Sequence, residues 1–178
     1  AVAEMPGYHK LVAYSDAAVI PYPTQEQRIS QTRYLATLCH GMGIDCPRIS
    51  LIHCSEHIDE RHFPHTGGYA DIIERGRQGE FGPCIIDGPL DLKTSMCPES
   101  LAVKGIDSPV GGDADALVFP DIEAANVFHK TITLLASARI AAVLQGPDVP
   151  VVMPSRGDDA DSKYYSLALA ALQSLKNA

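Results

Sequence analysis

The sequence has 178 residues and a mass of 19.1 kDa, which is about the size of one domain. Hydrophobic residues make up 46% and charged residues 20%, a composition typical of globular rather than disordered or fibrous proteins. Acidic residues outnumber basic ones 22 to 14, for a net charge of -8, which argues against a nucleic-acid partner because phosphate contacts need a basic face. No apolar run approaches the roughly 18 residues of a membrane helix, so no membrane partner is expected.

The cysteines and the first residues predict a cytoplasmic protein. The five cysteines are odd in number and form no CxxC pair, so reduced thiols are expected. The opening AVAEMPGYHK lacks the basic segment and apolar stretch of a signal peptide. It also lacks an initiator Met, which favours a fragment or a processed chain.

Short apolar stretches bounded by turn residues predict buried strands. They cover residues 11–14, 49–53, 84–86, 116–119, 140–144 and 149–153. Most are continuously apolar, which suits parallel strands covered on both faces. The last two, joined by QGPD, are compatible with a hairpin or with a crossing between two lobes.

Helical patterns separate these strands. Thr24 and Gln27 predict a capping box at the start of a helix that runs through Leu38. Further helices are predicted at about 69–76, 100–103, 122–137 and 159–175. This alternation predicts an α/β domain with a largely parallel sheet flanked by helices. The last helix has a wide apolar face that needs a covering surface.

The segment PSRGDDAD (154–161) joins an apolar strand to a helix, and ligands of open parallel sheets bind at the carboxyl ends of strands. Arg156 can stabilise an anion, the Ser155 hydroxyl can hydrogen-bond an oxyanion, and a nearby carboxylate can take a proton. A turn with an Asp N-cap explains the same residues. The turn DGPLD (87–91), after strand 84–86, is expected on the same ligand-binding side.

The segment SPVGG, preceded by Lys104, is a second candidate site. Gly111 and Gly112 allow a close backbone approach to an anion, Ser108 begins the segment, and Lys104 adds charge. A turn that needs positive φ is the alternative. The segment matches neither a P-loop nor a Rossmann fingerprint.

The segment PDIEAAN is a third candidate. It contains Asp121, Glu123 and Asn126, and Lys130 follows near one face of the same predicted helix. Asn126 can donate and accept hydrogen bonds toward a ligand. N-capping by Asp121 explains the segment equally well.

A histidine-rich stretch is the fourth candidate. It contains His53, Cys54, His57, His62 and His65, which are residue types that bind zinc. Their spacing matches no structural zinc pattern and the stretch reads as an exposed loop, so no metal site is expected.

Together and in this order, DGPLDL, KGIDSPVGGDADALVFPDIEAANVFHK and SRGDDADSKYYSLALA resemble the carboxyl-terminal part of phosphate acetyltransferases and phosphate butyryltransferases. The opening EMPGYHKLVAYSDAAVIPYPTQEQ is similar to the butyryltransferase branch, and the resemblance covers essentially all 178 residues. It implies the reversible conversion of acyl-CoA and phosphate into acyl phosphate and CoA. Coenzyme A and phosphate are then substrates, and no cofactor is expected.

The resemblance also implies a two-lobed fold like that of isocitrate and isopropylmalate dehydrogenases, with the site in the cleft. Residues 1–142 are then the second lobe, and 143–178 are a return segment of strand and helix that belongs to the first lobe. Most of the first lobe, with its substrate-binding arginines, is absent from the sequence, so the isolated chain is expected to be inactive. A homodimer is expected, with the apolar last helix packed on a partner chain.

The mechanism implied is direct transfer in a ternary complex. A carboxylate takes the CoA thiol proton, the thiolate attacks the acyl carbonyl, and cationic and hydroxyl groups stabilise the developing charge. Ser155 and Arg156 match the family's Ser-Arg pair, and Asp161 is the best match to its carboxylate. The expected substrate- and CoA-binding residues are Lys104, Ser108, Gly111, Gly112, Asp121, Glu123, Asn126 and Lys130. The family commonly has Gly where this sequence has Ala125.

Two alternatives belong to other classes. The chain is also compatible with a non-catalytic lobe that binds CoA or forms dimers. A metal-dependent dehydrogenase of the same fold would use the carboxylates Asp158, Asp159 and Asp161 for a divalent metal, although SRGDDAD and PDIEAAN argue against it.

Overall fold

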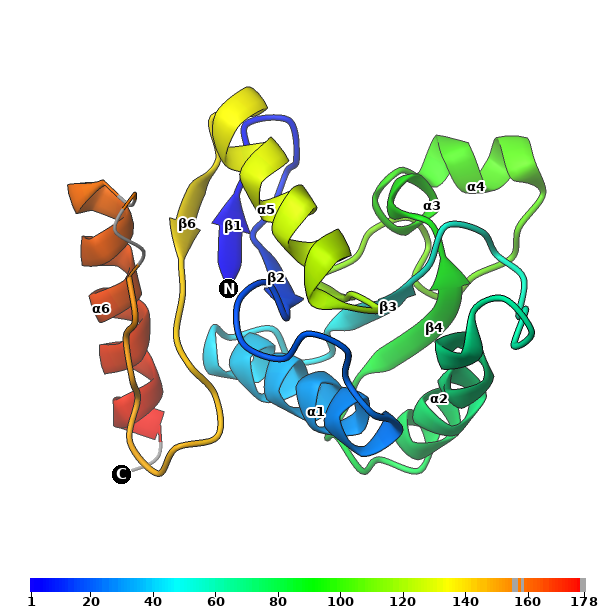
Figure 1. Cartoon of the computed structure of the whole chain (residues 1–178), viewed down its shortest axis with the longest axis horizontal. Coiled ribbons are helices and arrows are strands. Elements are labelled where there is room, and N and C mark those ends of the chain that lie inside the picture. The colour runs from blue at the N-terminus through cyan, green and yellow to red at the C-terminus, as the bar shows by residue number, and fades with distance from the viewer. Residues whose placement is uncertain (155–156, 158, 177–178) are drawn as a thin grey trace.

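The computed structural model describes residues 1–154, 157 and 159–176. Within them a six-stranded sheet has the strand order β4-β3-β5-β2-β1-β6 (Figure 1). The strands are β1 (Val2–Glu4), β2 (Val12–Ser15), β3 (Arg48–Ile52), β4 (Ile85–Leu90), β5 (Ala116–Val118) and β6 (Arg139–Ala141). The helices are α1 (Gln25–Gly41), α2 (Tyr69–Arg77), α3 (Leu92–Met96), α4 (Pro98–Lys104), α5 (Ile122–Leu135) and α6 (Ala160–Lys176), with a short 3-10 helix at Pro64–Gly68.

The sheet is largely parallel, as predicted. Strands β2, β5, β3 and β4 are parallel neighbours. Strand β1 is antiparallel to both β2 and β6, so β6 runs in the direction of β2. We call the side of the sheet at which the parallel strands end the carboxyl edge. The side at which they begin is the amino edge.

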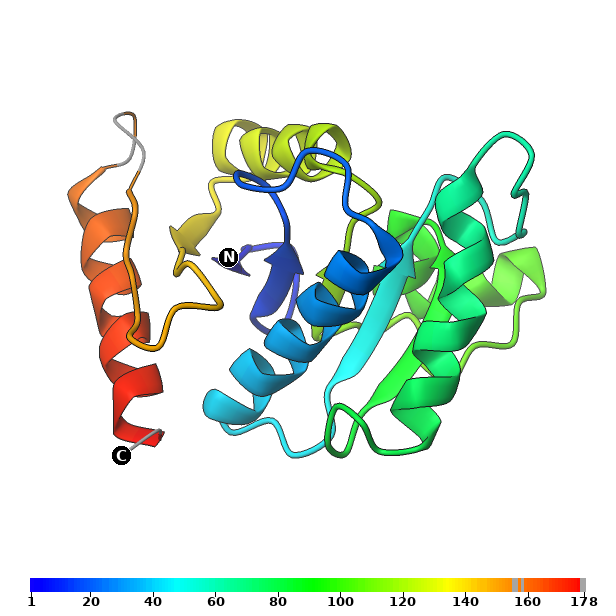
Figure 2. The ribbon, with the colours of Figure 1, turned by 60° about the horizontal axis from the view of Figure 1, so that its bottom comes forward.

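Helices cover both faces of the sheet (Figures 1 and 2). Alternate residues of a strand point to opposite faces, so Leu117 of β5 packs in one core cluster while Ala116 and Val118 pack in the other. Helices α1 and α2 complete the cluster around Ala116, and α4 and α5 complete the cluster around Leu117. All three residues of β5 are buried, as expected for a central parallel strand.

The predicted start of α1 is confirmed. The Thr24 hydroxyl accepts a hydrogen bond from the Gln27 amide at 3.3 Å, and the Thr24 amide donates to the Gln27 side chain at 2.9 Å. This reciprocal pair satisfies two N–H groups at a helix start. Strand β1 and helix α3 were not predicted, because runs of three and five residues are too short for a periodic signal.

Two predicted elements differ from the structure. The stretch 149–153 is not a strand; it makes one isolated antiparallel bridge, between Leu144 and Val151. Pro150 inside the stretch and Pro154 after it cannot donate backbone hydrogen bonds, which limits the pairing of this segment. The predicted turn at 87–91 instead continues β4 through Leu90. Gly88 makes this possible, since a Cβ there would lie 2.6 Å from the Leu51 carbonyl oxygen of the neighbouring strand.

Helix α6 packs against β6, and this contact buries only part of the apolar surface of the helix. The Ser166 hydroxyl accepts a hydrogen bond from the Ala142 amide at 2.9 Å, and Leu169 is buried. Tyr164 and Leu167, in contrast, are 67% and 61% exposed. Among the described residues, none of the helices has the length and hydrophobicity needed to cross a lipid bilayer.

Candidate active site

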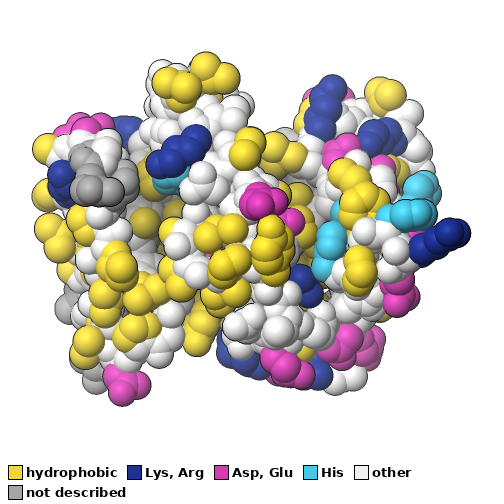
Figure 3. Space-filling view, viewed as in Figure 1, with side chains coloured by type: hydrophobic (Ala, Val, Ile, Leu, Met, Phe, Trp, Pro, Cys, Tyr) yellow, Lys and Arg dark blue, Asp and Glu magenta, His cyan; other side chains and the backbone are white. Residues whose placement is uncertain are grey.

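A cavity of about 720 Å³ opens where β2 and β6 end. We call it the carboxyl-edge pocket. Its walls are α1 side chains, the end of β2 with the loop 16–20 that follows it, one side of α5, and the linker 142–153 before α6. Hydrophobic side chains gather over the loop and the linker (Figure 3). Among them Val19 is 54% and Met153 69% exposed.

The loop after β2 is held by Asp16. Its carboxylate accepts hydrogen bonds from the amides of Ala18, Val19 and Ile20 at 2.9, 3.1 and 2.7 Å. These three hydrogen bonds to the Asp16 carboxylate fix the conformation of the loop. Asp16 was not among the predicted site residues, although it directly follows β2 and lines the pocket.

Helix α5 brings several predicted residues to this pocket. Asn126 and Lys130 line it, and the Asn126 amide donates to the Ala17 carbonyl at 3.0 Å. His129, which was not predicted, also lines the pocket and hydrogen-bonds the buried Tyr14 hydroxyl through Nδ1 at 2.6 Å. This face of α5 therefore combines an amide, an imidazole and a cation.

Asp121 and Glu123 hold the start of α5 instead of lining the pocket. The Asp121 carboxylate accepts from the Ala124 amide at 2.8 Å, which makes it the N-cap. The Tyr22 hydroxyl donates to Glu123 at 2.9 Å, which ties the loop before α1 to α5. Both carboxylates therefore stabilise the start of α5 at the margin of the pocket.

One stripe of α1 forms the opposite wall. Its residues recur at the three- and four-residue spacing of a single helix face: Gln27, Ser30, Gln31, Tyr34, Leu35 and Leu38. Gln31 is only 4% exposed, and neither its Oε1 nor its Nε2 has a hydrogen-bond partner among the described residues. Sequence reasoning did not single out Gln31, because its burial depends on packing that the sequence does not show.

Lys104 lies away from this pocket. Its Nζ contacts the carboxylates of Glu56 at 2.8 Å and Asp91 at 2.7 Å, and these contacts raise the pKa of Lys104. Burial alone would raise the pKa of Asp91, but hydrogen bonds from Lys104 and Thr94 outweigh it and lower that pKa to about 2. Lys104 therefore links the loops that follow β3 and β4.

The SPVGG segment lies at the amino edge, before β5. Arg48 Nη1 donates to the carbonyls of Pro109 and Val110. The buried Ser108 hydroxyl accepts from the Val110 amide at 3.3 Å. Gly112 has a φ of 69°, and a Cβ there would lie 2.5 Å from the Pro98 nitrogen. These contacts and the positive φ of Gly112 match the alternative interpretation of SPVGG as a turn.

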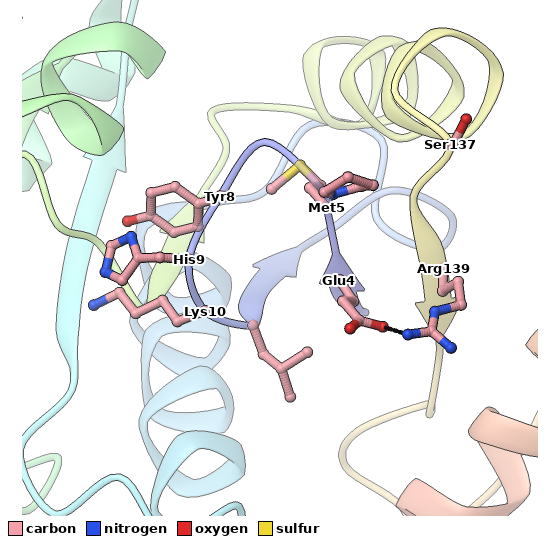
Figure 4. A pocket seen from close by; sticks show the side chains of 9 residues that line it. Glu4, Met5, Tyr8, His9, Lys10, Ser137 and Arg139 are labelled. Carbon is pink, nitrogen blue, oxygen red and sulfur yellow. Dashed lines mark ion pairs between the residues drawn. The ribbon is translucent and has the colours of Figure 1, made fainter.

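A second cavity, of about 540 Å³, also lies at the amino edge (Figure 4). We call it the amino-edge pocket. It is lined by Glu4, Met5, Pro6, Tyr8, His9, Lys10, Leu11, Ser137 and Arg139. Its charges are paired: Lys10 contacts Asp113 at 3.0 Å and Asp115 at 2.8 Å, and Arg139 pairs with Glu4.

The corner at 154–161 is described only in part. Ser155 and Arg156, like Asp158, lie outside the described residues. Asp161 is exposed in the first turn of α6. Asp159 accepts a hydrogen bond from the Ser162 amide at 2.7 Å, which lowers the pKa of Asp159 and matches the alternative of an Asp N-cap.

The linker before this corner folds back beside β6. The antiparallel bridge between Leu144 and Val151 turns the linker back toward the start of β6. There Arg139, the first residue of β6, donates to the Tyr165 hydroxyl of α6 at 3.1 Å. Asp161 is not among the residues that line the carboxyl-edge pocket, whereas Met153, just before the corner, is.

In the histidine-rich stretch, His53 and His65 lie against each other. His65 Nε2 and the Nδ1 of buried His53 are 3.3 Å apart. Burial, with smaller contributions from Arg28 and His53, lowers the pKa of His65 to about 4. Among the described residues, no three His, Cys, Asp or Glu side chains converge as they would around a metal ion.

Comparison with known proteins gives a consistent result. The family described as phosphate acetyl/butaryl transferase matches residues 1–171. The chain is 35% identical to a phosphate acetyltransferase of Thermotoga maritima, over 96% of this chain and 58% of that protein. It is 34% identical to a phosphate butyryltransferase of Clostridium beijerinckii, over 99% of this chain and 58% of that protein. The chain thus spans little more than half the length of these relatives.

A solved structure agrees with the sequence relatives. The crystal structure of a branched-chain phosphotransacylase from Enterococcus faecalis superposes with a TM-score of 0.87 at 28% identity, over 97% of this chain and 63% of that chain. A phosphotransacetylase from Streptococcus pyogenes gives a TM-score of 0.81 at 25% identity, over 98% of this chain and 53% of that chain.

Proposed function

Because the chain belongs to the phosphate acetyl/butaryl transferase family, we propose that the protein containing it transfers an acyl group between CoA and phosphate. The ordered match of the family over residues 1–171 carries this proposal. The acyl-CoA and inorganic phosphate are the substrates, and acyl phosphate and CoA are the products.

In the direction of acyl-CoA synthesis, a carboxylate removes the proton from the CoA thiol, and the sulfur attacks the acyl carbonyl. The new S–C bond forms while the C–O bond to phosphate breaks, and phosphate leaves with the electron pair of that bond. Arg156 and the Ser155 hydroxyl stabilise the developing negative charge. Asp161 is the proposed base, although the first turn of a helix stabilises the charged form of a carboxylate and so weakens it as a base.

The carboxyl-edge pocket supports the binding part of this proposal. Its volume of about 720 Å³ falls in the range of small-molecule sites. Among the described residues Lys130 makes no ion pair, so its ammonium group is available to a phosphate. Asn126 adds an amide from the preceding turn of α5. We assign both residues to substrate binding.

The test follows thiol release from acyl-CoA in phosphate buffer, using the protein that contains this chain. Arg156→Ala is expected to slow the reaction by at least about 100-fold, the usual effect of removing a group that stabilises an oxyanion. Lys163→Ala, on the first turns of α6, is the matched control and should leave the rate unchanged. Equal rates for wild type and Arg156→Ala would exclude the role given to Arg156.

A second candidate function is a non-catalytic lobe that binds CoA or forms dimers. The exposed Tyr164 and Leu167 on α6 favour it, because large apolar side chains on one helix face are typical of interfaces. Sedimentation at several protein concentrations would reveal a dimer. Calorimetric titration with CoA, combined with absence of thiol release, would identify a binding lobe.

A further inference from the structure

The most unusual polar group near the carboxyl-edge pocket is the Gln31 side chain. It lies at the centre of the α1 stripe that forms one wall, and it is 4% exposed. Neither its Oε1 nor its Nε2 has a hydrogen-bond partner among the described residues. Leaving both ends of an amide unpaired in a buried position is unfavourable, so the side chain is retained at a cost to stability.

The surroundings of Gln31 suit a flat, largely apolar group. Tyr34 and Leu35 follow it on the same wall, and Val143 and Leu144 stand on the linker that completes the pocket. An aromatic ring and aliphatic side chains are surfaces on which a nucleobase stacks well. A phosphate is a poorer match here, because its oxygens act chiefly as acceptors, whereas the Gln31 amide offers one donor group and one acceptor.

The opposite side of the pocket carries the positive charge. Lys130 on α5 lines the same cavity as Gln31 on α1. Among the described residues, Asp16 supplies the one carboxylate that lines it, and this carboxylate accepts three backbone hydrogen bonds from its own loop. A wall on which apolar side chains surround the unpaired Gln31 amide, facing a wall that carries Lys130, matches a ligand with a base at one end and phosphates at the other.

We propose, given the acyltransferase function proposed above, that Gln31 binds the adenine of CoA in the carboxyl-edge pocket. A planar carboxamide donates to one ring nitrogen of adenine and accepts from its 6-amino group, which pairs both unsatisfied atoms at once. A turn about the side-chain torsions of Gln31 presents the amide to the pocket. Lys130 then lies on the side of the nucleotide phosphates.

The experiment measures binding rather than turnover. Adenosine 3′,5′-bisphosphate and its inosine counterpart, in which the 6-amino donor becomes a carbonyl acceptor, are titrated calorimetrically into the protein that contains this chain. The adenosine compound should bind about 10-fold or more tightly than the inosine compound. In Gln31→Leu this preference should disappear, with at least a 10-fold loss of affinity for the adenosine compound. Ser30→Ala, which alters the same wall at a hydroxyl already bonded to the Glu26 carbonyl, should keep the preference.

Urea unfolding of the same variants supplies a second readout. The midpoint should rise in Gln31→Leu, because the variant removes an unpaired buried amide without leaving a cavity. A lower midpoint would overturn the proposal by showing that Gln31 has a structural partner. So would a base preference that survives in Gln31→Leu, or a wild-type protein that binds pantetheine 4′-phosphate but not adenosine bisphosphate. Failure of acyl transfer with an intact base preference would instead reject the acyltransferase function alone.

Discussion

The two pockets lie at opposite edges of one sheet and differ in how their polar groups are used. At the amino edge, Lys10 is neutralised by Asp113 and Asp115, and Arg139 by Glu4. At the carboxyl edge, Lys130 makes no ion pair within the described part of the chain, and the Gln31 amide is unsatisfied. The ion pairs at the amino edge stabilise the fold, whereas for the carboxyl-edge groups we propose a role in ligand binding.

The largest expected effect is on stability at the amino edge. Asp115 is 7% exposed; its carboxylate accepts from the Arg48 amide at 2.8 Å and pairs with Lys10. Asp115→Ala should therefore lower the free energy of unfolding by about 3 kcal/mol, because it leaves a backbone donor unpaired and a cation with fewer partners. Urea unfolding measures the change.

The matched control at that edge is Asp113→Ala. The Asp113 side chain is 38% exposed, so water screens its ion pair and its loss should cost no more than about 1 kcal/mol. Binding of adenosine 3′,5′-bisphosphate should be unchanged in both variants. A loss of binding in Asp115→Ala at temperatures where it remains folded would contradict the separation of the two edges.

A smaller effect is expected from Tyr14 at the carboxyl edge. Tyr14 is fully buried, and its hydroxyl is 2.6 Å from His129 Nδ1. Tyr14→Phe should lower the free energy of unfolding by about 1 kcal/mol, which is the net contribution of one hydrogen bond. Tyr34→Phe is the control, since Tyr34 lines the same pocket but is 37% exposed. Equal stability of Tyr14→Phe and wild type would show that this contact does not hold α5 on the sheet.

The smallest expected effect concerns pH. The pKa of His65 is about 4 in the folded protein, against about 6.5 for an unperturbed histidine, so the unfolded chain binds the proton more readily. The stabilisation is complete above pH 6.5 and is lost as the pH falls from 6.5 toward 4. Because His65 is only partly buried, the change should stay below about 1 kcal/mol.

Urea midpoints between pH 6.5 and 5 test this expectation. His65→Gln should flatten the pH dependence, whereas His57→Gln, at an exposed position of the same stretch, should not. A slope that is unaltered in His65→Gln would assign the pH dependence to other groups. The neutral state of His65 would then make no measurable contribution to the stability of the fold.

Sequence reasoning succeeded where the cause is local. The capping box at Thr24 and Gln27 needs only neighbouring residues, and the apolar run at 116–119 predicts a buried strand from its composition alone. The ordered motifs identified the family, because several motifs in one order are far more specific than any single one. The same reasoning failed at 149–153, where an apolar run is not paired along its length.

The candidate site was predicted less completely, for a physical reason. Asn126 and Lys130 were expected, and they do line the carboxyl-edge pocket. The SPVGG glycines were expected beside them, but the chain places that segment before β5, at the other edge. Which edge a loop reaches depends on strand direction and order, and these are set by contacts between distant segments.

The sequence by itself determined the helix starts, most of the parallel strands and the family of the chain, because periodicity, capping and motif order are written along the chain. Only the tertiary structure decided that Gln31 of α1 and Lys130 of α5 face the same cavity. It also decided that Lys10 meets Asp113 and Asp115. Which of these distant residues come together depends on how helices and loops cover the two faces of the sheet, and no local sequence pattern encodes that arrangement.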